Sequence, residues 1–188
     1  TLTVQPVIGF ETLTNFRIIV IYSFATSLVA AAPVTIVATR LLADCLWLKR
    51  FGEVRGLLIG SCILSLAAVV PVTLLLAWYF AMPARLALSL VAMSAMVSLI
   101  WVALSYAGAV RDYAGVTMSF IIGLLIAVLV SVGAALAGLG AVGMAWGFLG
   151  GLTVIFFGLT ERILATFPEP LTDPLAGLRA LVAGMSRF

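Results

Sequence analysis

Histidine is absent from all 188 residues of this chain, and cysteine occurs only twice. The missing imidazole excludes histidine general bases, zinc or haem ligation by histidine, and Ser–His catalysis within this chain. Two cysteines are too few to hold a metal cluster, and we interpret Cys45 and Cys62 as small buried thiols. No metal site and no cofactor site is therefore predicted.

Charge is also scarce, because Asp, Glu, Lys and Arg make up only 9% of the residues. An ordinary soluble domain has about 25% charged residues. Four stretches contain none of these four residue types: 18–39, 56–84, 86–110 and 113–160. Each is long enough to cross a bilayer, which takes ~20 apolar residues in a helix. The composition therefore excludes an ordinary soluble domain and indicates a membrane protein.

The longest apolar stretch can cross the membrane twice, because Gly138 and Gly140 interrupt it. The predicted fold is an all-α, polytopic transmembrane bundle, residues 1–160, with Phe51-Gly52 at the first turn. Its five spans are expected at about residues 16–44, 56–80, 86–109, 114–136 and 140–160.

Residues 161–188 form a second, proline-containing region that is predicted to be a cytosolic linker and an amphipathic helix. Asp173 and Pro174 fit the cap and first position of that helix. Apolar side chains then recur at helical spacing: Leu175, Leu178, Leu181, Val182 and Met185. We expect this helix to lie on the membrane surface, and packing on a cytosolic domain is the alternative.

The basic residues indicate the orientation of the spans, because they favour alternate loops. If the first loop is cytosolic, that side carries Arg40, Lys49, Arg50, Arg55, Arg111, Arg162, Arg179 and Arg187, and the other side carries Arg17 and Arg85. This distribution fits the positive-inside rule, with the first residue outside and the last one in the cytosol. An upstream span, or a cleaved signal peptide, would then be needed. No loop is basic enough to predict a nucleic-acid partner.

Two prolines and one row of glycines stand out inside the predicted spans. Pro33 and Pro71 each remove a backbone hydrogen bond, so both are candidate hinges, with a static kink as the alternative. Gly143, Gly147 and Gly151 are four residues apart and share a helix face. Such spacing allows membrane helices to approach closely, although a surface that slides during transport is also possible.

No catalytic motif is present, so the chain is not predicted to be an enzyme. The polar side chains in the middles of the spans are hydroxyls, which commonly bond back to their own helix. Charged residues gather at the span ends instead. Candidate gate residues are Arg40, Asp44, Arg111, Asp112, Glu161 and Arg162 on the cytosolic side, and Glu11 and Arg17 outside. Solvated surface charge is the alternative interpretation.

Four segments resemble the PelG family, which exports the Pel exopolysaccharide. They are residues 16–24 (FRIIVIYSF), 32–44 (APVTIVATRLLAD), 110–113 (VRDY) and 162–168 (RILATFP). The resemblance implies the multidrug/oligosaccharidyl-lipid/polysaccharide (MOP) flippase superfamily, whose members have about twelve spans in two lobes. This chain would then be spans two to six, which is most of the N-terminal lobe.

The resemblance also implies a function and a location. It implies export of a polysaccharide across the bacterial inner membrane by alternating access, together with membrane and cytosolic subunits of a synthase and export complex. Two alternatives stay open: a small-molecule efflux carrier of the same superfamily, and a membrane scaffold that anchors a cytosolic synthase. An intramembrane enzyme is the most distant alternative.

Overall fold

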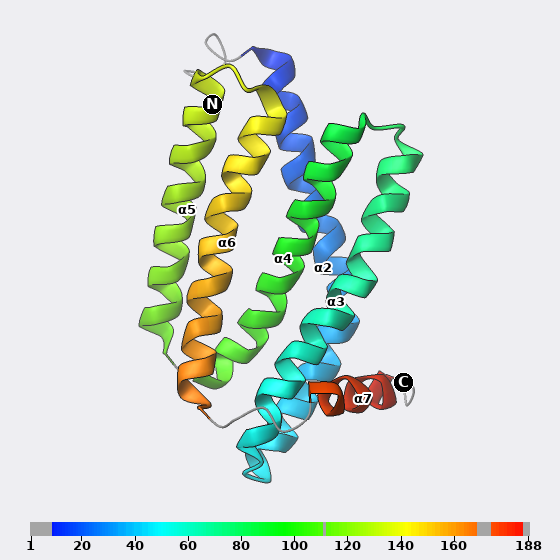
Figure 1. Ribbon diagram of the computed structural model, residues 1–188, viewed down its shortest axis with the longest axis vertical. Coiled ribbons are helices and arrows are strands. Elements are labelled where there is room, and N and C mark those ends of the chain that lie inside the picture. Colours follow the sequence, from blue (N-terminus) through cyan, green and yellow to red (C-terminus); the bar gives the residue numbers. More distant parts are fainter. Residues whose placement is uncertain (1–8, 111, 169–173, 186–188) are drawn as a thin grey trace.

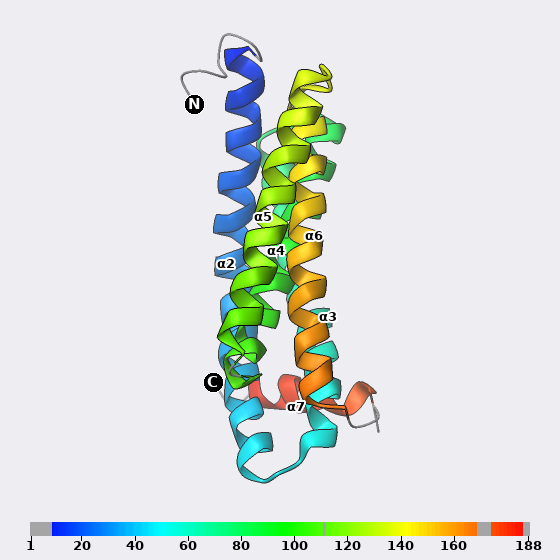
Figure 2. The ribbon, with the colours of Figure 1, turned by 90° about the vertical axis from the view of Figure 1, so that its left-hand side faces the viewer.

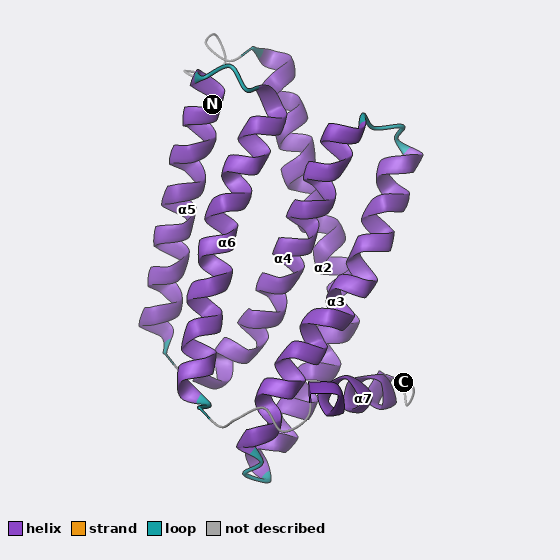
Figure 3. Cartoon of the chain, in the orientation of Figure 1, coloured by secondary structure: helices purple, strands orange, loops and turns teal. Residues whose placement is uncertain are grey.

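The computed structural model describes residues 9–110, 112–168 and 174–185, and this part of the chain is helical apart from its turns (Figures 1 and 3). The helices are α2 (Phe10–Trp47), α3 (Phe51–Tyr79), α4 (Ala84–Val110), α5 (Tyr113–Leu136), α6 (Gly140–Thr166) and α7 (Pro174–Met185). Five of them, α2 to α6, are long and apolar enough to cross a membrane. The all-α, polytopic fold is therefore confirmed.

The helices extend beyond the apolar stretches from which the spans were predicted. α2 begins at Phe10 and ends at Trp47, so Arg17 and Asp44 lie inside it, and α6 continues past Glu161 to Thr166. The reason is that backbone hydrogen bonding continues wherever the sequence allows a helix, whereas hydropathy marks only the part that lipid can cover.

The first turn differs from the prediction. Phe51 and Gly52 already belong to α3, and the chain reverses at Leu48–Arg50. Lys49 adopts a φ of 56°, a left-handed conformation that the sequence gives no reason to expect of a lysine. Between α5 and α6, by contrast, Gly138 and Gly140 have φ values of 74° and 65°, so the predicted glycine break does turn the chain.

The five long helices form a bundle with two ends (Figures 1 and 2). We call the end with the α2–α3 turn, the α4–α5 turn and the last residues of α6 the hairpin end, and the opposite one the far end. α4 packs against α2, α3 and α6, whereas α5 packs mainly on α6. The hairpin end carries most of the charge in the described residues: Arg40, Asp44, Lys49, Arg50, Glu53, Arg55, Asp112, Glu161, Arg162 and Arg179.

Hydroxyl groups inside the bundle mostly bond within their own helix, as expected. Ser94 donates to the carbonyl of Leu90 at 2.8 Å, and Ser61 donates to that of Leu57 at 2.8 Å. Ser61 also lies 2.9 Å from the hydroxyl of Tyr106, which is completely buried. These bonds satisfy polar groups that lipid could not hydrate.

α5 and α6 approach each other most closely where both present small residues. A Cβ atom added to Gly151 would collide with the carbonyl oxygen of Gly123 and with Ala127. One added to Gly147 would lie 3.0 Å from the backbone nitrogen of Ser131. The Ser131 hydroxyl, in turn, donates to the carbonyl of Met144 at 2.9 Å. Gly147 and Gly151 therefore allow α5 and α6 to pack closely. In a bilayer the hydrophobic effect does not drive helices together, so close van der Waals packing stabilises their association.

Gly143 does not share this contact, because a Cβ there would meet the side chain of Leu139. The partner face on α5 was not anticipated from the sequence. It is a row of small residues four apart: Gly115, Ser119, Gly123, Ala127, Ser131 and Ala135.

The short helix α7 crosses α3 and α2 near the hairpin end (Figures 1 and 2). Gly177 lies against the backbone of Gly56, so closely that a Cβ on Gly177 would overlap its carbonyl. Leu181 is completely buried in the core, whereas Val182 remains 52% exposed. The helix thus packs on the bundle itself, an arrangement that the sequence did not suggest. Asp173 lies outside the described residues.

Pro33 and Pro71 lie inside continuous helices, α2 and α3, and both are exposed on the surface of the bundle. Neither proline ends its helix, which fits the tolerance of proline in membrane helices. A bend or a hinge at these positions remains a prediction.

Candidate functional site

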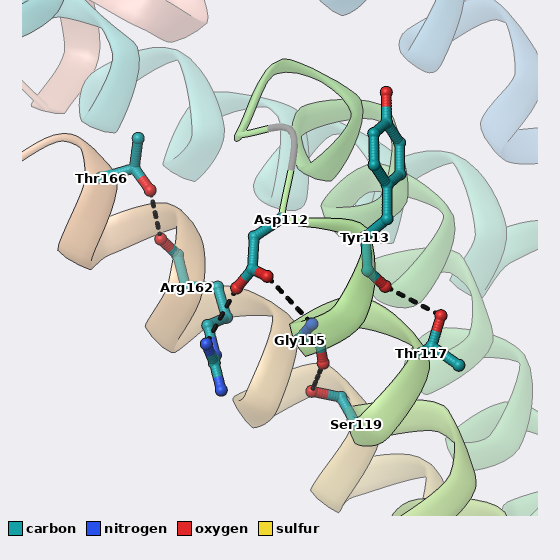
Figure 4. Close-up of polar contacts among 7 residues, drawn as sticks. All are labelled: Asp112, Tyr113, Gly115, Thr117, Ser119, Arg162 and Thr166. Atoms are coloured by element: carbon teal, nitrogen blue, oxygen red, sulfur yellow. Dashed lines mark hydrogen bonds and ion pairs between the residues drawn. The ribbon is translucent and has the colours of Figure 1, made fainter.

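The charged residues at the hairpin end form the candidate site, and two of the predicted gate residues come together there. Asp112 precedes α5, and Arg162 lies on the last turns of α6 (Figure 4). Nη1 of Arg162 donates to Oδ2 of Asp112 at 2.8 Å. Two candidates that are 50 residues apart in the sequence therefore form one contact between helices.

Asp112 has a second role, because it caps α5. Its Oδ1 accepts a hydrogen bond from the backbone N–H of Gly115 at 3.0 Å (Figure 4). A carboxylate at this position also faces the positive end of the α5 dipole. The Asp112 side chain thus caps α5 and also accepts a hydrogen bond from Arg162 of the neighbouring helix α6.

The absence of a side chain at Gly115 makes this geometry possible. A Cβ atom there would overlap Oδ2 of Asp112 and lie 2.9 Å from the guanidinium of Arg162. Gly115 is therefore the position that lets the arginine reach across the start of α5.

The Asp112–Arg162 pair is only partly shielded from solvent. The side chain of Arg162 is 50% exposed and that of Asp112 is 35% exposed. Exposed ion pairs contribute ~0–1 kcal/mol each, so this contact orients two helix ends without strongly stabilising the fold. Such a contact can break and re-form during a conformational change.

Arg55 is a second connection at this end, and we did not anticipate it from the sequence. Its Nε donates to the carbonyl of Phe167 at 2.7 Å, and its Nη2 donates to that of Leu164 at 3.0 Å. These carbonyls end α6, where no further helical N–H is available. Because Phe51 also stacks on Phe167, with ring centroids 6.2 Å apart, α3 holds the end of α6 by two contacts.

The remaining gate candidates lie apart from this pair. Arg40, Asp44 and Glu161 are exposed near the hairpin end, while Glu11 and Arg17 are exposed near the far end on α2. Arg111 lies outside the described residues. Arg50 and Glu53, which were not candidates, form a long, exposed ion pair of 3.8 Å at the start of α3.

Comparison with known proteins bears on what these helices do. No curated protein and no solved structure matches the chain. A family model does match over residues 1–180: PelG, described as "Putative exopolysaccharide Exporter (EPS-E)". Because the match covers nearly the whole chain, and because five helices can cross a membrane, this multi-pass membrane chain belongs to the PelG family of exopolysaccharide exporters.

Proposed function

We propose that this chain is one part of a transporter that moves an exopolysaccharide outward across the bacterial inner membrane by alternating access. The match to an exporter family over residues 1–180 carries the proposal. In this proposal the hairpin end faces the cytosol, because most of the basic residues gather there. The far end then faces outward.

The gate in this mechanism is a network at the hairpin end. Arg162 connects α6 to the start of α5, and Arg55 connects the end of α6 to α3. Because these two contacts connect α3, α5 and α6, the three helices move together at this end of the lobe. Asp44 and Glu161 remain candidate gate residues, because their exposed carboxylates can pair with groups on another lobe or subunit.

The hinge positions in this mechanism are Pro33 and Pro71. Each lies inside a long helix, and a proline leaves the carbonyl four residues earlier without its helical donor. The local backbone is therefore easier to bend there than elsewhere in the same helix.

The gate can be tested with substitutions that keep the cap of α5 intact. Asp112→Asn removes the charge but retains a good N-cap residue, and Arg162→Gln removes the other charge. A pair worth at most ~1 kcal/mol shifts a two-state population up to about fivefold. We expect each variant to slow export of the polymer, and the double variant Asp112→Asn/Arg162→Gln to be no slower than either single variant.

The matched control is Arg50→Gln/Glu53→Gln, which removes an exposed pair at the same end of the bundle without touching α5 or α6. Export is measured as polymer on the cell surface at equal protein expression. If the Asp112 and Arg162 variants export polymer at the wild-type rate, this pair is ordinary surface charge and not part of a gate.

Measuring total and exported polymer in the same cells distinguishes an exporter from the alternative, a membrane scaffold. A scaffold anchors the synthase, so its failure would reduce the total amount of polymer made. A gate defect leaves polymer inside the cell and reduces only the exported fraction. The proposed partners, membrane and cytosolic subunits of the synthase, would be recovered with the variants as with the wild type.

A further inference from the structure

A crevice of about 370 Å³ opens on the surface between α3 and α6, toward the hairpin end. Both helices pack on α4, and both are long and apolar enough to cross a membrane. It is lined mainly by apolar side chains: Leu58, Ile59, Cys62, Ile63 and Leu66 from α3, and Phe156 and Leu164 from α6, with Arg55 and Thr160.

The mouth of the crevice carries a positive charge. Arg55 lies there, and its Nε and Nη2 donate to two carbonyls of α6. Both acceptors are uncharged carbonyls, and no carboxylate of the described residues pairs with this guanidinium. Among the described residues Nη1 has no hydrogen-bond partner, and it can bind an anion at the mouth.

A hydroxyl group without a partner lies one helical turn deeper. Thr160 lines the crevice, and its Oγ1 is buried with no hydrogen-bond partner among the described residues. Thr160 precedes Leu164 by four residues, which is ~6 Å along α6. A buried hydroxyl left without an acceptor is destabilising. Because this Oγ1 is covered by protein atoms, a ligand oxygen accepts from it only once the Thr160 side chain has turned toward the crevice.

The length of the crevice corresponds to one leaflet. Its lining on α3 runs from Arg55 to Leu66, which are eleven residue steps apart, or ~16 Å at a rise of ~1.5 Å per residue. The hydrocarbon core of a bilayer is ~30 Å thick, so half of it is ~15 Å. Beyond Thr160 the lining is apolar as far as Leu66 and Phe156.

We propose that the α3–α6 crevice binds one anionic glycerophospholipid of the leaflet at the hairpin end. Along the crevice, the cation of Arg55 is followed by the hydroxyl group of Thr160 and then by an apolar wall. A glycerophospholipid presents phosphate, ester carbonyl and acyl chain in the same order. The phosphate accepts from Arg55, the ester carbonyl accepts from Thr160 once that side chain has turned toward the crevice, and one acyl chain fills the apolar part.

The lipid proposal rests on the lining of the crevice and does not require the export mechanism. A lipid there fills the space between α3 and α6 beside the Arg55 contact. It would therefore hold together the two helices that Arg55 already connects.

The test is native mass spectrometry of the complete protein, delipidated and titrated with phosphatidylglycerol or with phosphatidylcholine of the same chains. One basic residue near a lipid headgroup favours an anionic lipid by about fivefold in affinity. We expect one phosphatidylglycerol to be retained about fivefold more tightly than phosphatidylcholine. Equal retention of the two lipids would overturn the anionic assignment.

The position is tested by filling the crevice. Ile63→Trp places a bulky ring inside it, whereas Ile121→Trp makes the same change on the exposed face of α5. We expect the retained lipid to be lost only in Ile63→Trp. Retention of the lipid in that variant as in the wild type would overturn the site.

A second measurement uses a variant in which the lining of the crevice is unchanged. In a Cys45→Ser background, Cys62 is the one cysteine left in residues 1–188, and because it lines the crevice we expect N-phenylmaleimide to label it. Prior alkylation should abolish the retained phosphatidylglycerol, and prior phosphatidylglycerol should slow the alkylation more than phosphatidylcholine does. If the lipid and the label bind without affecting each other, the proposal is wrong.

Discussion

The contact between α5 and α6 makes a sharp prediction, because two adjacent glycines of α6 have opposite surroundings. A Cβ added to Gly151 would overlap the carbonyl oxygen of Gly123 and lie 2.5 Å from the backbone nitrogen of Ala127. A Cβ added to Gly150 would meet nothing within 4 Å. Gly151→Ala should therefore push the helices apart, and Gly150→Ala should not.

The expected magnitude follows from two opposing effects. Replacing glycine by alanine within a helix favours the helix by ~1 kcal/mol, and this gain is common to both variants. Overpacking costs ~1–3 kcal/mol, and here the obstacle is backbone, which cannot rotate away. We therefore expect Gly151→Ala to be less stable than Gly150→Ala by ~1–3 kcal/mol.

The assay is reversible unfolding of the complete protein in mixed micelles with increasing sodium dodecyl sulfate. Comparing two glycines of the same helix cancels the helix propensity and most effects on the unfolded state. Equal free energies of unfolding for the two variants would show that α5 and α6 do not pack as closely as described.

Three further predictions concern the other connections of the bundle. Leu181→Ala should destabilise by ~2–5 kcal/mol, because it empties a buried position, whereas Val182→Ala on the exposed face should change stability little, as measured by the same unfolding assay. Arg55→Gln should speed amide hydrogen exchange in the last turn of α6, and unchanged exchange there would refute the Arg55 contact. Cysteines placed at Pro83 and Tyr113 should react with an impermeant maleimide from opposite sides of the membrane, and reaction of both from one side would refute the proposed topology.

The fold was predictable because membrane helices are marked by long uncharged stretches. Those stretches are visible in the sequence and need no knowledge of which helix packs on which. The first turn was misplaced for a related reason. Glycine is the residue that commonly allows a left-handed turn, but Lys49 occupies that conformation and Gly52 lies in the first turn of α3.

The site was only partly predictable, because its contacts cross between helices. Asp112 and Arg162 were both candidates, yet the sequence did not indicate that they contact each other, because the contact spans 50 residues. Arg55 was missed because its acceptors are backbone carbonyls 109 and 112 residues away, which no side-chain pattern marks. The spacing of small residues on α5 was the one signal present in the sequence that could have identified the partner of the α6 glycines.

The central claim is that the complete protein carries the polymer outward, and the most direct measurement is where the polymer is found when this protein is depleted. Cells that keep the synthase expressed are separated into interior and surface fractions, and the polymer is quantified in each. An exporter predicts that polymer remains inside and disappears from the surface, and that restoring the protein reverses this. Polymer that still reaches the surface at the normal rate without the protein would contradict the claim.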